Sequence, residues 1–158
     1  MKKFELTSEF VTFLGKTLFR IKALVSFGDV AEGELGGFIE RENNLDQSGD
    51  AWVYGDARVF GNALVFGDAQ VSGNALVYGN ARVQNCRDYS ATSCFGSENR
   101  TTTFFRTKDG GISVRCGCFY GTLREFREKV KERHGDSRLA KEYLMLADLM
   151  EFRLSKDE

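Results

Sequence analysis

The chain has 158 residues, 42% hydrophobic and 28% charged, a composition typical of a soluble globular protein with one domain and a small appendage. The formal net charge of −1 argues against long duplex nucleic acid and acidic membranes as partners, because both attract strongly basic proteins. The sequence has no apolar run of the roughly 20 residues that span a bilayer and no secretion signal at its polar N-terminus, so we expect a cytoplasmic protein with reduced cysteines.

The N-terminal segment, residues 1–27, contains one clear strand pattern. Residues 17–24 alternate in apolar character and predict a strand, whereas residues 4–14 are compatible with a strand or a short helix. Residues 28–50 contain four apolar side chains at irregular spacing, which favour a degenerate first coil of the repeat that follows. These side chains are Val30, Leu35, Ile39 and Leu45.

A six-residue pattern repeats from residue 51 to residue 86. Alanine stands first, valine third and glycine fifth, and Asp or Asn follows each glycine. The alanines lie at 51, 57, 63, 69, 75 and 81, the valines at 53, 59, 65, 71, 77 and 83, and the glycines at 55, 61, 67, 73 and 79. Five consecutive hexads fit the pattern and a sixth fits in most positions, so the pattern is specific.

The spacing of this pattern has a direct structural reading. Alanine and valine are two residues apart, so both point to the same side of an extended segment, and Gly-Asp or Gly-Asn then turns the chain. Three such walls close a coil of about 18 residues, and stacked coils bury a ladder of valines. The alternative, a flat meander of short hairpins, would bury too little apolar surface. We therefore predict a β-helix over residues 28–99.

The 18-residue period also predicts which outward side chains stack. It places Trp52 over Gln70, Tyr54 over Ser72, Arg58 over Leu76, Phe60 over Tyr78, and Leu64 over Arg82. The outward set is too apolar for an isolated monomer. Two interpretations are open: burial under flanking segments or sister subunits, or an aromatic shelf that stacks a planar ligand. The shelf would consist of Trp52, Tyr54, Phe60 and Tyr78.

The C-terminal part, residues 100–158, predicts two strands and two helices. Residues 101–108 and 111–119 flank Asp109-Gly110, which is a hairpin signal. Thr122 and Glu125 form a capping box that opens a helix through about Arg133. Ser137 can cap a second helix, whose apolar stripe is Leu139, Tyr143, Leu146 and Met150. The complete fold expectation is mainly β, with an N-terminal strand segment and a small C-terminal ββαα unit.

The hexads over residues 51–86 resemble the hexapeptide-repeat family, which implies a left-handed parallel β-helix and a homotrimer. Acyltransferases of that family place a histidine base on the prism between subunits. In this chain the single histidine, His134, lies at a predicted helix end, and Asp56 and Asp68 read as turn formers. The resemblance therefore implies an acyltransferase fold without its catalytic base.

A second resemblance, to small phage and prophage proteins, spans nearly the whole chain. It is carried by residues 20–24 (RIKAL), 35–40 (LGGFIE), the hexads, 100–111 (RTTTFFRTKDGG), 134–136 (HGD) and 140–144 (AKEYL). The likeness implies a phage origin, and hence a place in the host cytoplasm, and a compact accessory protein. Its members commonly carry the labels transferase or polymer-forming protein, which are analogies only.

The stretch from residue 100 to residue 115 is the best candidate for binding an anion. Arginine forks and threonine hydroxyls are suited to phosphate, whereas four cations are too few for a duplex groove. The alternative is a solvated hairpin face. The candidate residues are Arg100, Thr101, Thr102, Thr103, Arg106, Lys108 and Arg115. No metal or cofactor is expected, although a zinc site built from Cys86, Cys94, Cys116 and Cys118 is conceivable.

Three functions are compatible with the sequence. The first is a non-catalytic, oligomeric binding protein that holds a small anionic molecule such as a nucleotide; the specific hypothesis is an anti-defence sponge that sequesters a nucleotide immune signal of the host. The second is an acyltransferase that uses acetyl-CoA. The third is a protein-interaction module that inhibits a host factor through its exposed aromatic side chains.

Overall fold

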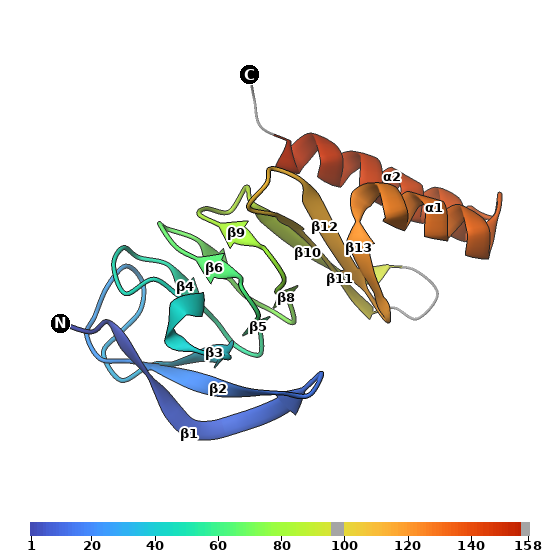
Figure 1. Ribbon diagram of the computed structural model, residues 1–158. Coiled ribbons are helices and arrows are strands. Elements are labelled where there is room, and N and C mark those ends of the chain that lie inside the picture. The colour runs from blue at the N-terminus through green and yellow to red at the C-terminus, as the bar shows by residue number, and fades with distance from the viewer. Residues whose placement is uncertain (96–99, 156–158) are drawn as a thin grey trace. The chain divides into compact units, whose positions relative to one another are not determined.

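The computed structural model describes residues 1–95 and 100–155, with the side chains of 94, 95 and 100 excepted. It divides the chain into two compact units, Met1–Cys86 and Arg87–Glu158 (Figure 1). The first unit contains the repeats and the second contains the helices. The predicted boundary between residues 99 and 100 lies later in the chain than this division.

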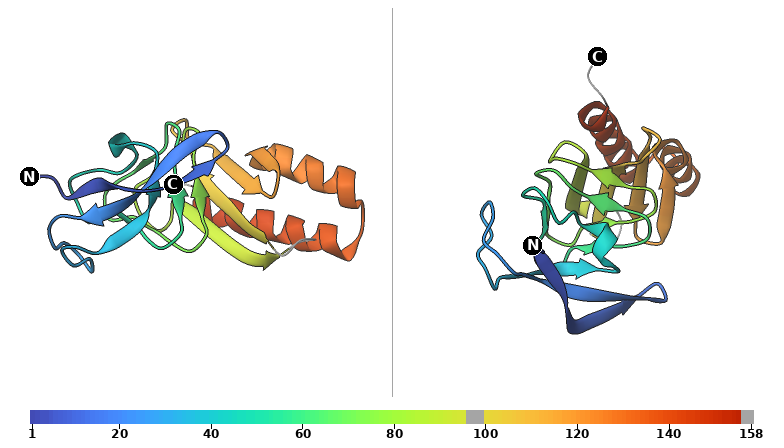
Figure 2. Two further views of the ribbon diagram at one scale, coloured as in Figure 1. Left: turned by 90° about the horizontal axis from the view of Figure 1, so that it is seen from below. Right: turned by 60° about the vertical axis from the view of Figure 1, so that its left-hand side comes forward.

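The first unit begins with an antiparallel hairpin. Strand β1 (Phe4–Phe13) pairs with β2 (Lys16–Ala23), and β2 pairs antiparallel with β3 (Leu35–Ile39). Residues 4–14, which left strand and helix open, are therefore a strand, and the predicted strand at 17–24 is confirmed. Strand β3 then pairs in parallel with the repeat region, so the hairpin extends one wall of the solenoid (Figure 2).

The hexads form six two-residue strands, each paired in parallel with the strand three hexads later. They are β4 (Trp52–Val53), β5 (Arg58–Val59), β6 (Leu64–Val65), β7 (Gln70–Val71), β8 (Leu76–Val77) and β9 (Arg82–Val83). Strand β4 pairs with β7, β5 with β8 and β6 with β9. All six valines are fully buried, and the alanines are at most 2% exposed. The predicted β-solenoid and its 18-residue register are confirmed.

The residues before the hexads add a partial coil with a different spacing. Ile39 pairs with Val59 and Leu45 bridges to Val65, which is two residues longer than the spacing of the regular coils. Val30, Ile39 and Leu45 are buried as predicted, but Leu35 is 53% exposed, so its assignment to the core was wrong. The reason is local, because β3 comes closest to the coil at Gly36 and Gly37. Leu35 lies before this point, at the start of the strand.

A short 3-10 helix, Glu42–Asn44, lies within the partial coil, between Ile39 and Leu45. The buried Asn44 side chain donates from Nδ2 to the carbonyls of Ala63, at 2.9 Å, and Gly61, at 3.2 Å. Its Oδ1 accepts from the Arg41 amide at 2.9 Å. These bonds satisfy backbone groups that the irregular coil leaves without strand partners.

The second unit is a four-stranded antiparallel sheet with two helices on one face. The sheet order is β10 (Tyr89–Phe95), β11 (Arg100–Arg106), β12 (Ile112–Cys116) and β13 (Phe119–Thr122). The helices are α1 (Leu123–His134) and α2 (Arg138–Leu154). The predicted ββαα unit was thus two strands short: the return strand breaks at Gly117, where φ is 58°, and β10 pairs with β11.

Both predicted helix caps are present. Thr122 accepts from the Glu125 amide at 3.1 Å while the Glu125 carboxylate accepts from the Thr122 amide at 2.9 Å, and Ser137 accepts from the Ala140 amide at 3.1 Å. Residues from the sheet and both helices form one core: Phe104, Val114, Leu123, Phe126, Val130, Ala140, Tyr143, Leu146, Ala147, Met150 and Leu154. Among the described residues, neither helix is long and apolar enough to cross a membrane.

Candidate functional site

The predicted aromatic shelf exists as a stack, but the chain covers it. Phe60 and Tyr78 lie parallel at a centroid distance of 4.6 Å and an interplanar angle of 8°, which is the contact that the 18-residue period predicts. Phe13, from β1, packs edge-on against Phe60 at 5.7 Å. As a result Phe60 is 2% and Tyr78 8% exposed. Burial under a flanking segment, the first of the two interpretations, accounts for this pair.

Trp52 is enclosed in the same manner on another wall. Phe4 and Phe27 pack edge-on against its indole, at 6.3 Å and 5.3 Å, and its side chain is fully buried. Tyr54 is half-buried, and the pKa of its phenol is raised by burial and then by the negative charges of Asp29 and Glu34. A planar ligand would have to displace the N-terminal segment to stack on this shelf.

The candidate anion-binding residues are divided between the two faces of the second unit's sheet. Side chains alternate along β11, so Thr102 and Arg106 share the face of Phe104, which packs on the helices. Thr101, Thr103 and Arg115 belong to the opposite face, where Thr103 is opposite Arg115 across β11 and β12. Of the three threonines, Thr102 and Thr103 are at most 1% exposed.

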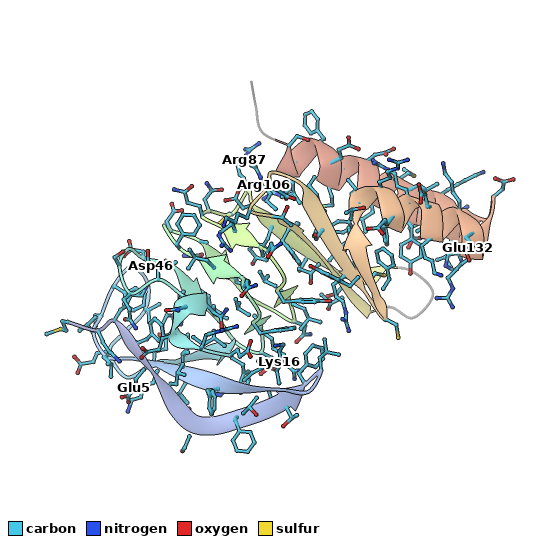
Figure 3. The ribbon with its side chains drawn as sticks, viewed as in Figure 1. Glu5, Lys16, Asp46, Arg87, Arg106 and Glu132 are labelled. Atoms are coloured by element: carbon cyan, nitrogen blue, oxygen red, sulfur yellow. The ribbon has the colours of Figure 1, made fainter. Side chains whose placement is uncertain are left out.

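Two polar side chains of this set, Arg106 and Thr102, make contacts within the unit. Arg106, labelled in Figure 3, lies 3.4 Å from the carboxylate of Asp88, and its amide donates to the Asp88 carbonyl at 2.8 Å. The Thr102 hydroxyl donates to the Cys116 sulfur at 3.4 Å. Lys108 is exposed in the turn, and the side chain of Arg100 lies outside the described residues. The structure therefore does not bring the described side chains of this set to one surface.

The turn beside Lys108 carries its own negative charge. The Asp109 carboxylate accepts hydrogen bonds from the Thr107 hydroxyl and the Gly111 amide, and these bonds lower the pKa of Asp109. An anion approaching Lys108 would meet this carboxylate. The local electrostatics thus favour a solvated turn over a phosphate site.

The groups that acid–base or metal chemistry would need are scattered. His134 is the last residue of α1, and its ring stacks on Tyr143 at 5.6 Å in the helical unit. Asp56, on a solenoid corner, lies 3.7 Å from the Arg20 guanidinium. Across residues 1–95 and 100–155, the described side chains include no group of three or more His, Cys, Asp or Glu that could hold a metal ion; the Cys94 side chain lies outside them.

A shallow hollow of about 490 Å³ lies beside the start of α1. Its lining includes Thr122, Leu123, Arg127, Glu151 and Leu154. The Arg127 guanidinium lies 2.6 Å from the Glu151 carboxylate and 2.9 Å from that of Asp148, so its charge is used to join the two helices. The hollow lies where the start of α1 and the end of α2 meet the turn at Gly110 and Gly111, and Arg127 at its wall is already paired.

Two groups of exposed apolar side chains were not identified from the sequence. One is the hairpin tip, defined here as Phe10, Leu14, Gly15 and Phe19 of β1, β2 and their turn; Phe10 is 58% and Leu14 56% exposed, and Phe19 beside Phe10 is half-buried. The other is the outer stripe of α2, defined as Met145, Leu149 and Phe152, which are 71%, 56% and 83% exposed. The four- and three-residue spacing of the outer stripe was a readable helical signal.

Leu14 has an unusual backbone conformation. Its φ is 52°, and it is the one non-glycine residue with a positive φ in the part of the chain that the structure describes. It is followed by Gly15, with a φ of 75°, and together they form the turn between β1 and β2. Leucine disfavours this region, which Gly, Asn and Asp tolerate.

Residues 57–73 and 69–84 match the family model of the YdcK beta solenoid repeat. The two matches overlap and lie within the regular hexads, from β5 to β9. They support the solenoid repeat fold that the parallel register displays. No curated protein matches the chain.

Proposed function

We propose that this protein is a non-catalytic protein-binding module, and that the hairpin tip inserts into an apolar pocket of a partner protein. The observation that carries the proposal is Leu14: an apolar side chain, 56% exposed, on a backbone position with a φ of 52°. The proposal corresponds to the third of the functions compatible with the sequence, with a different contact surface.

The conformation of Leu14 works against the stability of the free protein. A left-handed conformation costs a residue with a Cβ roughly 1–2 kcal/mol. The exposed side chain of Leu14 regains little of this by burial, and Asn or Gly would fit the turn without the cost. Strain that the fold does not repay is a reason to infer a role outside the folding of the chain.

The hairpin tip is held in a fixed position by its other face. Val11 and Phe13 pack inward on a cluster that includes Phe60, and the Arg58 guanidinium lies 4.8 Å from the Phe13 ring. Behind the tip, Lys16, labelled in Figure 3, lies 3.5 Å from the Glu40 carboxylate. A rigid apolar protrusion loses little conformational entropy when it enters a pocket, which favours binding.

The experiment compares capture of a partner by three forms of the full chain. The wild type, Leu14→Asn and Leu35→Asn would each be immobilised and exposed to lysate of the natural host cell. Leu35 is 53% exposed on β3, so its substitution is a matched loss of an exposed leucine away from the hairpin tip. We expect one stoichiometric partner that Leu35→Asn retains and Leu14→Asn loses.

Two further measurements make the result specific. A photoreactive phenylalanine at position 10 should cross-link to the same partner, and Leu14→Asn should raise the melting temperature of the free protein because it relieves strain. Equal capture by both variants, or a Leu14→Asn protein that is less stable than the wild type, would remove the basis for this proposal.

The narrower expectations stay predictions. They are the left-handed sense of the coil, the homotrimer, the phage origin with its place in the host cytoplasm, nucleotide sequestration, and acyl transfer with acetyl-CoA. Calorimetry with cyclic dinucleotides and trinucleotides tests sequestration, and binding of CoA tests acyl transfer. Native mass spectrometry tests the trimer.

A further inference from the structure

Helix α2 has two apolar stripes instead of one. The inner stripe, which includes Tyr143, Leu146 and Met150, packs in the core of the second unit. The outer stripe, Met145, Leu149 and Phe152, is not part of that core and is 56–83% exposed; the helix that carries it, α2, is labelled in Figure 1. Three large apolar side chains on one exposed helix face are typical of an interaction surface.

The outer stripe is arranged almost symmetrically about its middle residue. Met145 lies four residues before Leu149 and Phe152 three residues after it, so each is about one helical turn away. If a second α2 packs antiparallel with Leu149 near the two-fold axis, each Met145 meets the partner's Phe152. The same patch then serves on both chains, which is the property of an isologous interface.

The charges that flank the outer stripe follow the same symmetry. Glu142 and Arg153 are eleven residues apart, about three turns, and therefore lie along the same side of the helix at opposite ends of the stripe. In the antiparallel pair, Glu142 of each chain comes next to Arg153 of the other. A parallel pair would instead keep each residue at the same height as its own copy, so Glu142 of one chain and Arg153 of the other would lie about three turns apart.

We infer that the outer stripe of α2 is the contact surface for a second copy of this chain, packed antiparallel about a two-fold axis. This goes beyond the proposed function, because it involves a different unit and a different set of side chains from the hairpin tip. One helix pair is a small interface compared with the roughly 800 Å² per partner of standard complexes, so the dimer is expected to dissociate at micromolar concentrations.

The first test uses sedimentation velocity of the full chain over a range of micromolar concentrations. Leu149→Glu places a carboxylate next to the two-fold axis and should raise the dissociation constant at least about thirtyfold, as for the loss of a central interface residue. The control is Asn74→Asp, which adds the same charge at an exposed solenoid corner and makes a change that the repeat itself contains at positions 56 and 68. The control should sediment as the wild type does.

The second test exchanges the flanking charges. Glu142→Arg and Arg153→Glu should each weaken association, and the double variant should restore it, because only an antiparallel pair brings these two positions of different copies together. Thermal unfolding of each variant shows whether the fold is intact, so a loss of association without a loss of stability is attributable to the interface.

The outcomes separate this inference from the proposed function and from the predicted trimer. A dimer that Leu149→Glu disrupts and Leu14→Asn leaves unchanged supports the inference. A larger assembly that Leu149→Glu splits into two equal parts supports it as well. A monomer at all concentrations, association that Leu149→Glu does not change, or no restoration in the double charge exchange would overturn it. So would a foreign protein bound at the outer stripe of a chain that does not self-associate.

Discussion

Substitution of Gly37 by alanine tests whether the N-terminal sheet is docked on the solenoid as the structure shows. A Cβ at this position would lie 2.6 Å from the Ala57 carbonyl oxygen and 2.7 Å from Cγ1 of Val53. Real contacts of this kind are longer by almost 1 Å, and the nearest atom is backbone, so β3 has to move away from the coil.

The magnitude follows from what β3 loses when it moves. Amides of β3 and of the residue after it donate to solenoid carbonyls at two places, Phe38 to Ala57 at 3.0 Å and Glu40 to Val59 at 3.2 Å. Each backbone bond contributes about 1 kcal/mol, and overpacking adds about 1–3 kcal/mol. We therefore expect Gly37→Ala to lower the free energy of unfolding by about 3–5 kcal/mol, or roughly 15 °C in melting temperature.

The assay can isolate the first unit because the chain has a single tryptophan, Trp52, which is fully buried there. Its fluorescence during urea or thermal unfolding reports on the solenoid and not on the helices. The matched control is Gly73→Ala, where a Cβ meets nothing within 4 Å and the φ of 67° alone is unfavourable, at about 1 kcal/mol. Equal destabilisation by the two variants would refute the docking of β3 described here.

Three further outcomes are expected. Burial lowers the pKa of Lys3 from 10.5, and the negative charges of Asp46 and Asp50 offset this only in part. Just below pH 10.5 the unfolded chain therefore binds more protons than the folded chain, so the free energy of unfolding rises with pH there. Lys3→Met should abolish that rise in urea titrations. Thr122→Ala should lower stability by about 1 kcal/mol by circular dichroism. The hydrogen bond from the Thr122 amide, and then that with its side chain, lowers the pKa of Glu125, so the capping contribution is lost as pH falls through that pKa. Because Thr122→Ala removes only the side-chain bond, NMR titration should show the pKa raised toward its usual value but still below it.

The solenoid could be predicted to the residue because its physics is local and repeated. Each hexad contains its own strand, turn and inward side chains, so six valines and six alanines report the same register independently. The stacking of Phe60 on Tyr78 then follows by addition of 18. The partial coil could not be predicted in this way because Ile39 and Val59 are separated by two residues more than the regular period. Periodicity alone also did not reveal that β3 comes closest to the solenoid at Gly36 and Gly37.

The anion site was less predictable because the composition of a segment does not show to which face of the sheet each side chain points. A run of threonines and cations looks like one cluster in the sequence, yet a strand sends alternate residues to opposite faces. Applied to β11, that rule separates Thr102 and Arg106 from Thr101 and Thr103. The partner of Arg106 was harder to foresee, since Asp88 precedes β10 and β10 was not recognised as a strand.

The aromatic side chains that suggested a ligand site in the sequence serve instead as the surface on which the N-terminal hairpin packs. Phe60 and Tyr78 stack because of the repeat, but their exposure depends on Phe13, which reaches them from a hairpin far earlier in the chain. Because Phe13 occupies the shelf, the inward face of β1 is fixed, and the outward face carries Phe10 toward solvent. Alternation along one strand thus links the two surfaces: an edge contact on Phe60 holds the hairpin rigid, and the rigid hairpin keeps Leu14 in a conformation that leucine disfavours.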